Sequence, residues 1–151
     1  MSENNIFSEL IPDKYISKIS FSIDNYKKII QYLGLSTEDF IKEWNKNKYK
    51  IDEISNSKIN YDWVLAICLP LISYSIKQFL EDSKPIIIGI SALPGSGKST
   101  LGYVLEKISE TRNFPIDVIS IDDFYLPADD LDKAMKGNPW NAPRGLPGSH
   151  S

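Results

Sequence analysis

The stretch IIIGISALPGSGKST, residues 86–100, joins an apolar run to glycines, a lysine and hydroxyl side chains. Residues 92–99 follow the phosphate-loop pattern G-x-x-x-x-G-K-[ST], with Ala92 at the position of the first glycine. Gly95 and Gly97 permit backbone angles at which successive N–H groups turn toward one anion. Ala92 fits the pattern if its φ is negative, because only a positive φ makes a methyl group costly. The stretch therefore predicts a loop that binds phosphate groups.

The side chains after the glycines add charge and metal coordination to this loop. Lys98 would place its ammonium on the terminal phosphates of a nucleotide, and the Ser99 hydroxyl would join the coordination shell of Mg²⁺. A helix that begins near Lys98 adds its N-terminal N–H groups and its dipole to the same anion. The predicted nucleotide-binding residues are Ala92, Leu93, Pro94, Gly95, Ser96, Gly97, Lys98, Ser99 and Thr100.

Two carboxylates, Asp122 and Asp123, occur together in the segment VISIDDFYLP, residues 118–127. At the C-terminal end of a parallel strand they would face the crevice where ligands of open α/β sheets bind. One interpretation makes Asp122 a Mg²⁺ ligand, together with Ser99. We prefer Asp122 as the base that accepts the proton of an attacking hydroxyl group. Alternatively, Asp122 or Asp123 has no catalytic role and is a turn residue at the end of the strand.

Two apolar runs are predicted to be buried strands that position the loop and the carboxylates. Residues 86–90 lie between Lys84-Pro85 and the glycine-rich loop, and residues 116–121 form the second run. The apolar side chains of residues 101–108 fall at helical spacing between them. The order strand, loop, helix, strand predicts a βαβ unit. The predicted fold class is α/β, with an incomplete P-loop NTPase-type parallel sheet.

The chain before the first predicted strand has helical patterns. Apolar spacing and end signals predict a helix over residues 24–34, a second helix after the capping residues 36–39, and a longer one over about residues 61–82. Pro70 should bend or interrupt the longest helix, because it removes one backbone donor and crowds the preceding turn. Residues 1–22 have weak periodicity, and we expect them to be mobile or loosely helical.

Composition excludes several classes of function. The chain has 151 residues, of which 42% are hydrophobic and 25% charged, and its net charge is -3. It therefore lacks the basic field that binds nucleic acids without sequence preference. The single cysteine, Cys68, excludes an internal disulfide and a multi-cysteine zinc site, and we expect it in the core. The apolar residues 63–76 are too few to cross a bilayer and the N-terminus shows no targeting signal, so we expect a cytoplasmic protein without a membrane partner.

Three blocks in this order, ISALPGSGKST, SIDDFY and RGLPGSH, resemble the D-glycerate 3-kinases of plant and cyanobacterial type. These enzymes are relatives of the phosphoribulokinase, uridine kinase and pantothenate kinase group. The resemblance runs from about residue 61 to the end of the sequence and includes the helix that precedes the phosphate loop. It implies ATP and Mg²⁺ as cofactors and D-glycerate as the small-molecule substrate, with transfer of the γ-phosphoryl group to give 3-phosphoglycerate.

The resemblance also implies roles for single residues. Lys98 and Ser99 match the nucleotide and metal positions, and Asp122 matches the catalytic base. Arg144 matches a basic residue on the substrate side, where its planar guanidinium suits a carboxylate or a transferring phosphate; a solvated loop arginine is the alternative. His150 matches the histidine of the R-G-x-P-G-T-H-D block, but serines replace the family's threonine and aspartate, and a frayed terminus is the alternative.

We therefore predict an ATP-dependent small-molecule kinase with an incomplete kinase domain. Residues 1–83 would form a helical N-terminal region and residues 84–151 the start of a P-loop kinase domain, with Lys98, Asp122 and Arg144 as catalytic residues. One alternative keeps the kinase and changes the acceptor to a nucleoside, pantothenate or a sugar phosphate, which a panel of acceptors would separate. The other is a truncated, non-catalytic fragment, which the downstream reading frame would test. The sequence does not indicate an oligomeric state.

Overall fold

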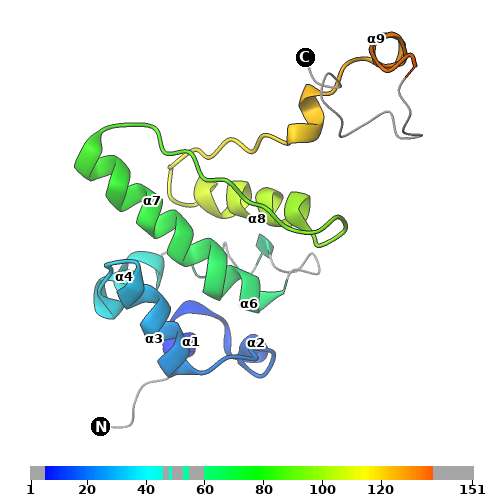
Figure 1. Ribbon diagram of the computed structural model, residues 1–151. Coiled ribbons are helices and arrows are strands. Elements are labelled where there is room, and N and C mark those ends of the chain that lie inside the picture. The colour runs from blue at the N-terminus through cyan, green and yellow to red at the C-terminus, as the bar shows by residue number, and fades with distance from the viewer. Residues whose placement is uncertain (1–5, 46–47, 49–52, 55–59, 138–151) are drawn as a thin grey trace, which may run out of the picture. The chain divides into compact units, whose positions relative to one another are not determined.

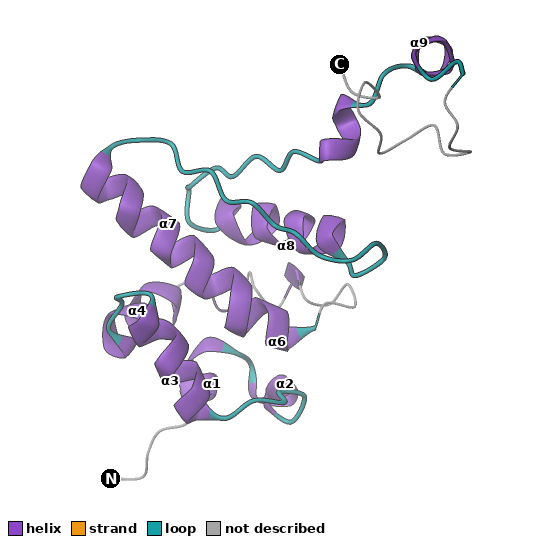
Figure 2. Cartoon of the chain, in the orientation of Figure 1, coloured by secondary structure: helices purple, strands orange, loops and turns teal. Residues whose placement is uncertain are grey.

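Helices dominate the computed structural model, which describes residues 6–45, 48, 53–54 and 60–137 (Figures 1 and 2). The chain divides into two compact units, Met1–Asp117 and Val118–Ser151, and each is treated by itself. The elements, among which η1 is a π-helix and η2 a 3-10 helix, are α1 (Ile6–Leu10), α2 (Asp13–Ile16), α3 (Ile23–Tyr32), α4 (Thr37–Asn45), α6 (Tyr61–Trp63), η1 (Val64–Cys68), α7 (Leu69–Asp82), α8 (Lys98–Glu110), η2 (Ile121–Phe124) and α9 (Ala128–Ala134).

The predicted helices of the N-terminal region are confirmed, and their ends lie at the predicted signals. Helix α3 begins after Ser22, whose hydroxyl accepts a hydrogen bond from the backbone of the first turn, and it ends before Gly34, which has a φ of +70°. Helix α4 begins after Ser36, whose Oγ accepts a hydrogen bond from the Asp39 N–H at 3.0 Å. Capping hydroxyls satisfy N–H groups that lack an intrahelical partner, and a left-handed glycine ends the helix without strain.

The long helix predicted over residues 61–82 is present, and Pro70 interrupts its α-helical pattern as expected. The turn before the proline is a π-helix, η1, in which the Leu69 N–H donates to the carbonyl of Val64. Proline has no N–H, and its ring crowds the carbonyl four residues earlier, which is that of Ala66. In a regular α-helix this turn would lack the hydrogen bond from residue 70, and the proline ring would crowd the carbonyl of Ala66. The wider π-helical turn lies immediately before Pro70, at the place of this conflict.

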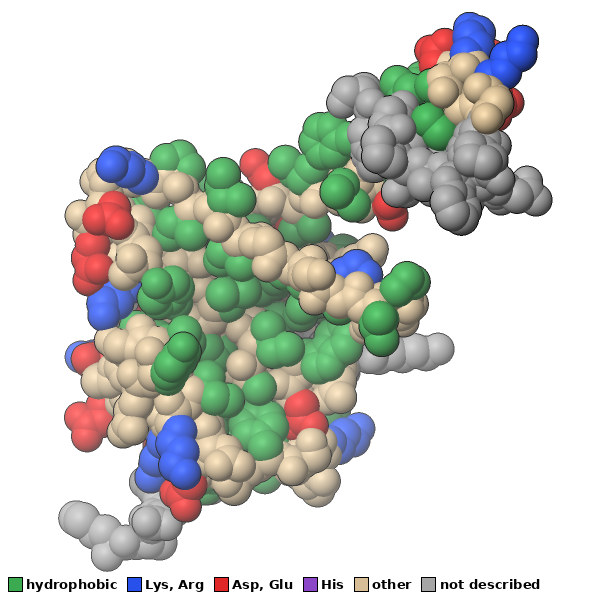
Figure 3. Space-filling model, viewed as in Figure 1, with side chains coloured by type: hydrophobic (Ala, Val, Ile, Leu, Met, Phe, Trp, Pro, Cys, Tyr) green, Lys and Arg blue, Asp and Glu red, His purple; other side chains and the backbone are tan. Residues whose placement is uncertain are grey.

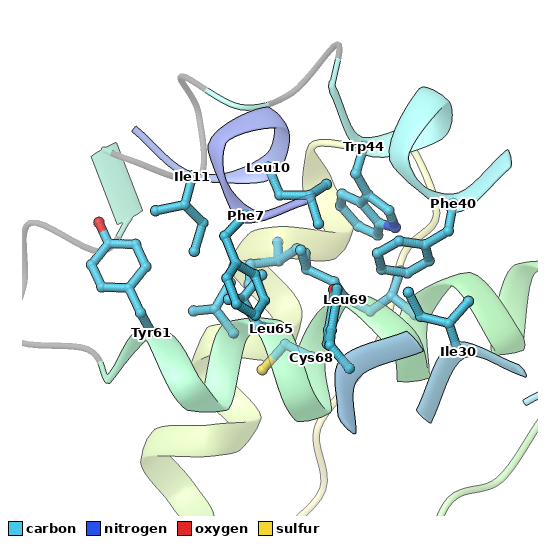
Figure 4. Packing of buried hydrophobic residues seen from close by; sticks show 14 of the residues in the cluster. Phe7, Leu10, Ile11, Ile30, Phe40, Trp44, Tyr61, Leu65, Cys68 and Leu69 are labelled. Carbon is cyan, nitrogen blue, oxygen red and sulfur yellow. The ribbon is translucent and has the colours of Figure 1, made fainter. Parts of the chain in front are cut away.

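The core of the first unit lies where α1, α3 and α4 meet η1, α7 and α8 (Figure 4). By length and composition alone, Tyr61–Asp82 is apolar enough to cross a membrane, but 44% of its most apolar window is buried inside the protein. The hydrophobic core includes its residues Tyr61, Val64, Leu65, Cys68, Leu69 and Ile72. The largest fully buried side chains are Trp44, Tyr26, Phe40, Leu10, Ile11, Ile30, Leu65, Leu69, Ile72, Ile108 and Val64.

The N-terminal segment contains the short helices α1 and α2 and contributes side chains to the core. Phe7, Leu10 and Ile11 are buried in the core, and α1 packs against α4. Of the two expectations for this segment, mobile or loosely helical, the helical one is confirmed for residues 6–10 and 13–16. The signal was available, since the apolar residues at positions 6, 7, 10 and 11 fall on one face of a helix.

The predicted parallel sheet is wrong: no β-strand lies within the residues that the structure describes. Residues 86–90 and 114–120 run as loop, and Figure 3 shows hydrophobic side chains at the molecular surface. Ile87 is 97% exposed, and Ile119 is 70% exposed. An extended segment becomes a strand only when its N–H and C=O groups pair with a neighbouring strand, and these runs have no such ladder in the described chain. The α/β fold class with a P-loop NTPase-type sheet is therefore replaced by a helical architecture.

Candidate functional site

The predicted phosphate loop leads directly into α8, and its backbone has the angles that its glycines permit. Gly97 is the N-cap of α8 and has a φ of +91°, and Gly95 has a φ of +75°. These values lie in the left-handed region that side chains disfavour. Ala92 does not have a positive φ, so the departure from the first glycine of the pattern introduces no strain there.

Lys98, the first residue of α8, folds its side chain back over the loop. Its Nζ donates to the carbonyl oxygens of Ala92 at 2.9 Å and of Leu93 at 3.1 Å. The helical ladder begins with the Leu101 N–H, which donates to the Gly97 carbonyl at 2.9 Å. Because Gly97 has no side chain with which to cap the helix, the N–H groups of the first turn remain available to an anion. The structure thus brings the ammonium group and the loop backbone together.

Trp63 of α6 lies against the loop, a contact that sequence reasoning missed. A Cβ added to Gly97 would lie only 2.7 Å from Cη2 of the Trp63 indole. The two residues are far apart in the sequence, and neither motif nor periodicity signals such a tertiary contact. A side chain at Gly97 is therefore disfavoured by the backbone angle and would also have to displace the edge of the Trp63 ring.

The two neighbouring aspartates differ in what they bind within the second unit. The Asp123 carboxylate accepts the Ser120 N–H at 3.1 Å, while the Ser120 hydroxyl accepts the Asp122 N–H at 3.2 Å. This reciprocal pattern is a capping box at the start of η2 (Ile121–Phe124). Asp123 therefore has a structural role, and the exposed Asp122 carboxylate has no hydrogen bond to any residue that the structure describes.

The remaining predicted site residues are distributed as follows. The loop with Lys98 and Ser99 belongs to the first unit, and Asp122 belongs to the second. Arg144 and His150 lie outside the described residues. Across residues 6–45, 48, 53–54 and 60–137 no group of three or more His, Cys, Asp or Glu side chains could hold a metal ion. A nucleotide-bound Mg²⁺ does not depend on such a group, since phosphates and water supply most of its ligands.

Cys68 is not part of the candidate site. It is buried in the core, as predicted, and burial raises the pKa of its thiol to about 12. A thiol with so high a pKa stays protonated near neutral pH and is a poor nucleophile.

The chain is similar to two curated proteins that are named as kinases. Over 73 residues it is 42% identical to the chloroplastic D-glycerate 3-kinase of Arabidopsis thaliana, which covers 46% of this chain and 16% of that protein. Over 90 residues it is 39% identical to the uncharacterized kinase mug58 of Schizosaccharomyces pombe, which covers 54% of this chain and 32% of that one. No family model matches the chain, and no solved structure matches it. The chain therefore spans less than a third of the length of these two relatives, and over about half of its own length it is related to kinases.

Proposed function

We propose that this chain binds MgATP at residues 92–100 and contributes to the transfer of the γ-phosphoryl group to a hydroxyl of D-glycerate. The observation that carries the proposal is the loop itself. Two glycines with positive φ lead into the N-terminus of α8 (Lys98–Glu110), and an ammonium group lies over the loop carbonyls. Its support is the similarity to a D-glycerate 3-kinase over 46% of the chain.

The roles of the loop residues follow from their positions. Lys98 has a flexible side chain, and its two carbonyl partners are weaker acceptors than a phosphate oxygen. We expect its Nζ to exchange these carbonyls for the terminal phosphates when a nucleotide binds. Ser99 is exposed at the start of α8, where its hydroxyl can coordinate Mg²⁺. MgATP would supply the phosphoryl group, and the loop would position it and neutralise its charge.

Asp122 is the proposed base for the acceptor hydroxyl. Its neighbour Asp123 is engaged in the capping box, whereas the carboxylate of Asp122 is exposed and acceptor-only when ionised. Proton acceptance by a positioned carboxylate accelerates such a reaction by roughly 10²–10⁴-fold. Arg144, outside the described residues, is retained as the proposed group that binds the glycerate carboxylate.

A Lys98→Ala variant tests the nucleotide site. We expect MgATP binding, measured by isothermal titration calorimetry, to weaken at least about tenfold, because one cation aimed at the phosphates is lost. Lys107→Ala is the matched control, since Lys107 lies on the same helix and pairs with Glu110 at 2.6 Å on the surface. Equal MgATP affinity of the wild type and a folded Lys98→Ala variant would contradict the proposal.

The acceptor is tested by turnover with the full chain. ATP-dependent phosphorylation is measured for D-glycerate, a nucleoside, pantothenate and a sugar phosphate under the same conditions. We expect D-glycerate to have the highest kcat/KM, because the similar protein from Arabidopsis thaliana carries that name. A higher kcat/KM for another acceptor would keep the kinase and replace the substrate.

A further inference from the structure

We propose that Trp63 is a positioning residue that holds the nucleotide-binding loop in its left-handed turn before the nucleotide binds. This inference rests on the proposed function of the loop. It concerns a residue outside the phosphate-loop pattern, on the short helix α6 (Tyr61–Trp63), and it assigns that residue to the site through its contact with Gly97.

The contact involves the outer edge of the indole. A Cβ at Gly97 would lie 2.7 Å from Cη2, 3.5 Å from Cζ3 and 3.7 Å from Cζ2 of Trp63. A separation of 2.7 Å is shorter than van der Waals contact between carbons, so the ring occupies the space that a side chain at Gly97 would need. Gly97 is also the N-cap of α8, so the ring touches the residue at which the loop becomes a helix.

The rest of the loop is open to solvent. Residues 91–96 are exposed, and Leu93 is 80% exposed. A Cβ added to Gly95 would meet nothing within 4 Å, although Gly95 also has a positive φ. Glycine-rich segments lose much conformational entropy when they become ordered, so a loop of this kind needs an external contact to keep one conformation. Trp63 supplies such a contact at one of its two left-handed residues.

The residues next to Trp63 on α6 are anchored to the N-terminal segment. The ring of Tyr61 is buried and stacks on Tyr15 with a centroid distance of 4.5 Å. The Asp62 carboxylate accepts the Ser20 N–H at 3.0 Å and also the Ser20 hydroxyl. The two residues that precede Trp63 thus connect α6 to α2 and to the loop that follows α2. A rigid support of this kind is what keeps donors in a binding geometry.

Ligand affinity is the first test. The probe is inorganic tripolyphosphate with Mg²⁺, titrated by calorimetry into the full chain. We expect Trp63→Phe, which lacks the outer ring atoms, to bind about tenfold more weakly, because the loop then spends less time in the competent conformation. Phe79→Ala is the control: it removes a partly exposed aromatic side chain that packs on Phe114, and its affinity should equal that of the wild type. Unchanged or tighter binding by Trp63→Phe overturns the inference.

Fluorescence supplies a signature that a general loss of stability would not change. Tripolyphosphate does not absorb near-ultraviolet light, so any change in tryptophan emission reports the protein. We expect the wild type to show a change in emission on binding and Trp63→Phe to show none at saturating ligand. The same change in Trp63→Phe would assign the signal to Trp44 or Trp140, the other tryptophans, and would overturn the inference.

A double-mutant cycle of melting temperatures, measured without ligand, separates this inference from the proposed function. We expect Gly97→Ala to lower the melting temperature more than Gly95→Ala, because both residues have positive φ but only Gly97 meets the ring. In the Trp63→Phe background, Gly97→Ala and Gly95→Ala should lower the melting temperature by the same amount. Equal losses already in the wild-type background would overturn the inference. A wild type that shows the expected cycle but binds no tripolyphosphate would refute the proposed function alone.

Discussion

Replacing Tyr26 by phenylalanine should stabilise the first unit. Tyr26 is fully buried, and its hydroxyl has no hydrogen-bond partner in the part of the chain that the structure describes. Its ring packs against Phe7, Phe21 and Phe40 at centroid distances of 5.6, 5.8 and 5.9 Å. Phenylalanine keeps these ring contacts and removes the unpaired polar group. The substitution therefore isolates the cost of burying one hydroxyl.

The expected magnitude follows from the burial of that group. An unsatisfied buried hydroxyl costs about 1–3 kcal/mol, and the small space that it leaves offsets part of the gain. We expect the free energy of unfolding to rise by about 1–2 kcal/mol. For a chain of 151 residues, each kcal/mol shifts the melting temperature by about 2–4 °C, so the expected rise is about 2–8 °C.

The effect should grow at alkaline pH. Burial raises the pKa of Tyr26 well above its usual value of 10.0. Because the folded protein holds a proton that the unfolded chain releases, ionisation of this group does not lower the wild-type stability below pH 10 and lowers it as the pH rises above that value. The phenylalanine variant lacks this loss. The advantage of Tyr26→Phe over the wild type should therefore widen above pH 10.

The assay is thermal unfolding followed by circular dichroism at neutral pH and at a series of alkaline values. Tyr32→Phe is the control, since Tyr32 is 91% exposed and its hydroxyl loses no hydration on folding. We expect its melting temperature to equal that of the wild type. A Tyr26→Phe variant that is less stable than the wild type by about 1 kcal/mol would show that the hydroxyl has a partner in solution and would refute the reasoning.

Three further experiments test the site and the core. Asp122→Asn should lower kcat far more than it raises the KM for the nucleotide. Asp123→Asn should instead lower the free energy of unfolding by about 1 kcal/mol, because it weakens the capping box. A loss of kcat in Asp123→Asn together with a loss of stability in Asp122→Asn would contradict the assignment. Ser73→Ala leaves the buried indole N–H of Trp44 without its acceptor and should cost about 1–3 kcal/mol in urea unfolding, so a loss near zero would contradict the bond. Cys68, with its pKa near 12, should resist iodoacetamide in the folded protein and react in urea, and rapid modification of the folded form would contradict its burial.

The helices could be predicted because their signals are local. Ser22 and Ser36 cap α3 and α4 through backbone groups within the next turn, and Gly34 ends α3 with a positive φ. Pro70 acts on its own turn, and η1 appears where its missing N–H and its ring require it. In each case the energy that decides the conformation comes from residues within about five positions along the chain. No knowledge of the rest of the molecule is needed.

The phosphate loop could also be predicted because its signals are local. The contact with Trp63 that supports the loop could not be predicted. Gly95, Gly97 and Lys98 determine the backbone and charge of the loop within one short segment. The contact of Gly97 with Trp63 and the bond between Asp62 and Ser20 depend on how the helices pack. Spacing along the sequence carries no signal for such contacts. The candidate site was therefore predictable as a pattern and not as an assembled structure.

The apolar run at residues 86–90 explains why the sheet prediction failed. Ile86, Ile88 and Ile90 are 37%, 43% and 43% exposed, whereas Ile87 is 97% exposed. Exposure that alternates with every second residue is the pattern of an extended chain with one side against the protein. β-branched residues favour that local conformation, but hydrogen bonding and burial need a second segment at the right distance. The isoleucines thus indicate a preference for extended backbone. The amino-acid composition of one segment cannot determine which other segment would pair with it to form a strand.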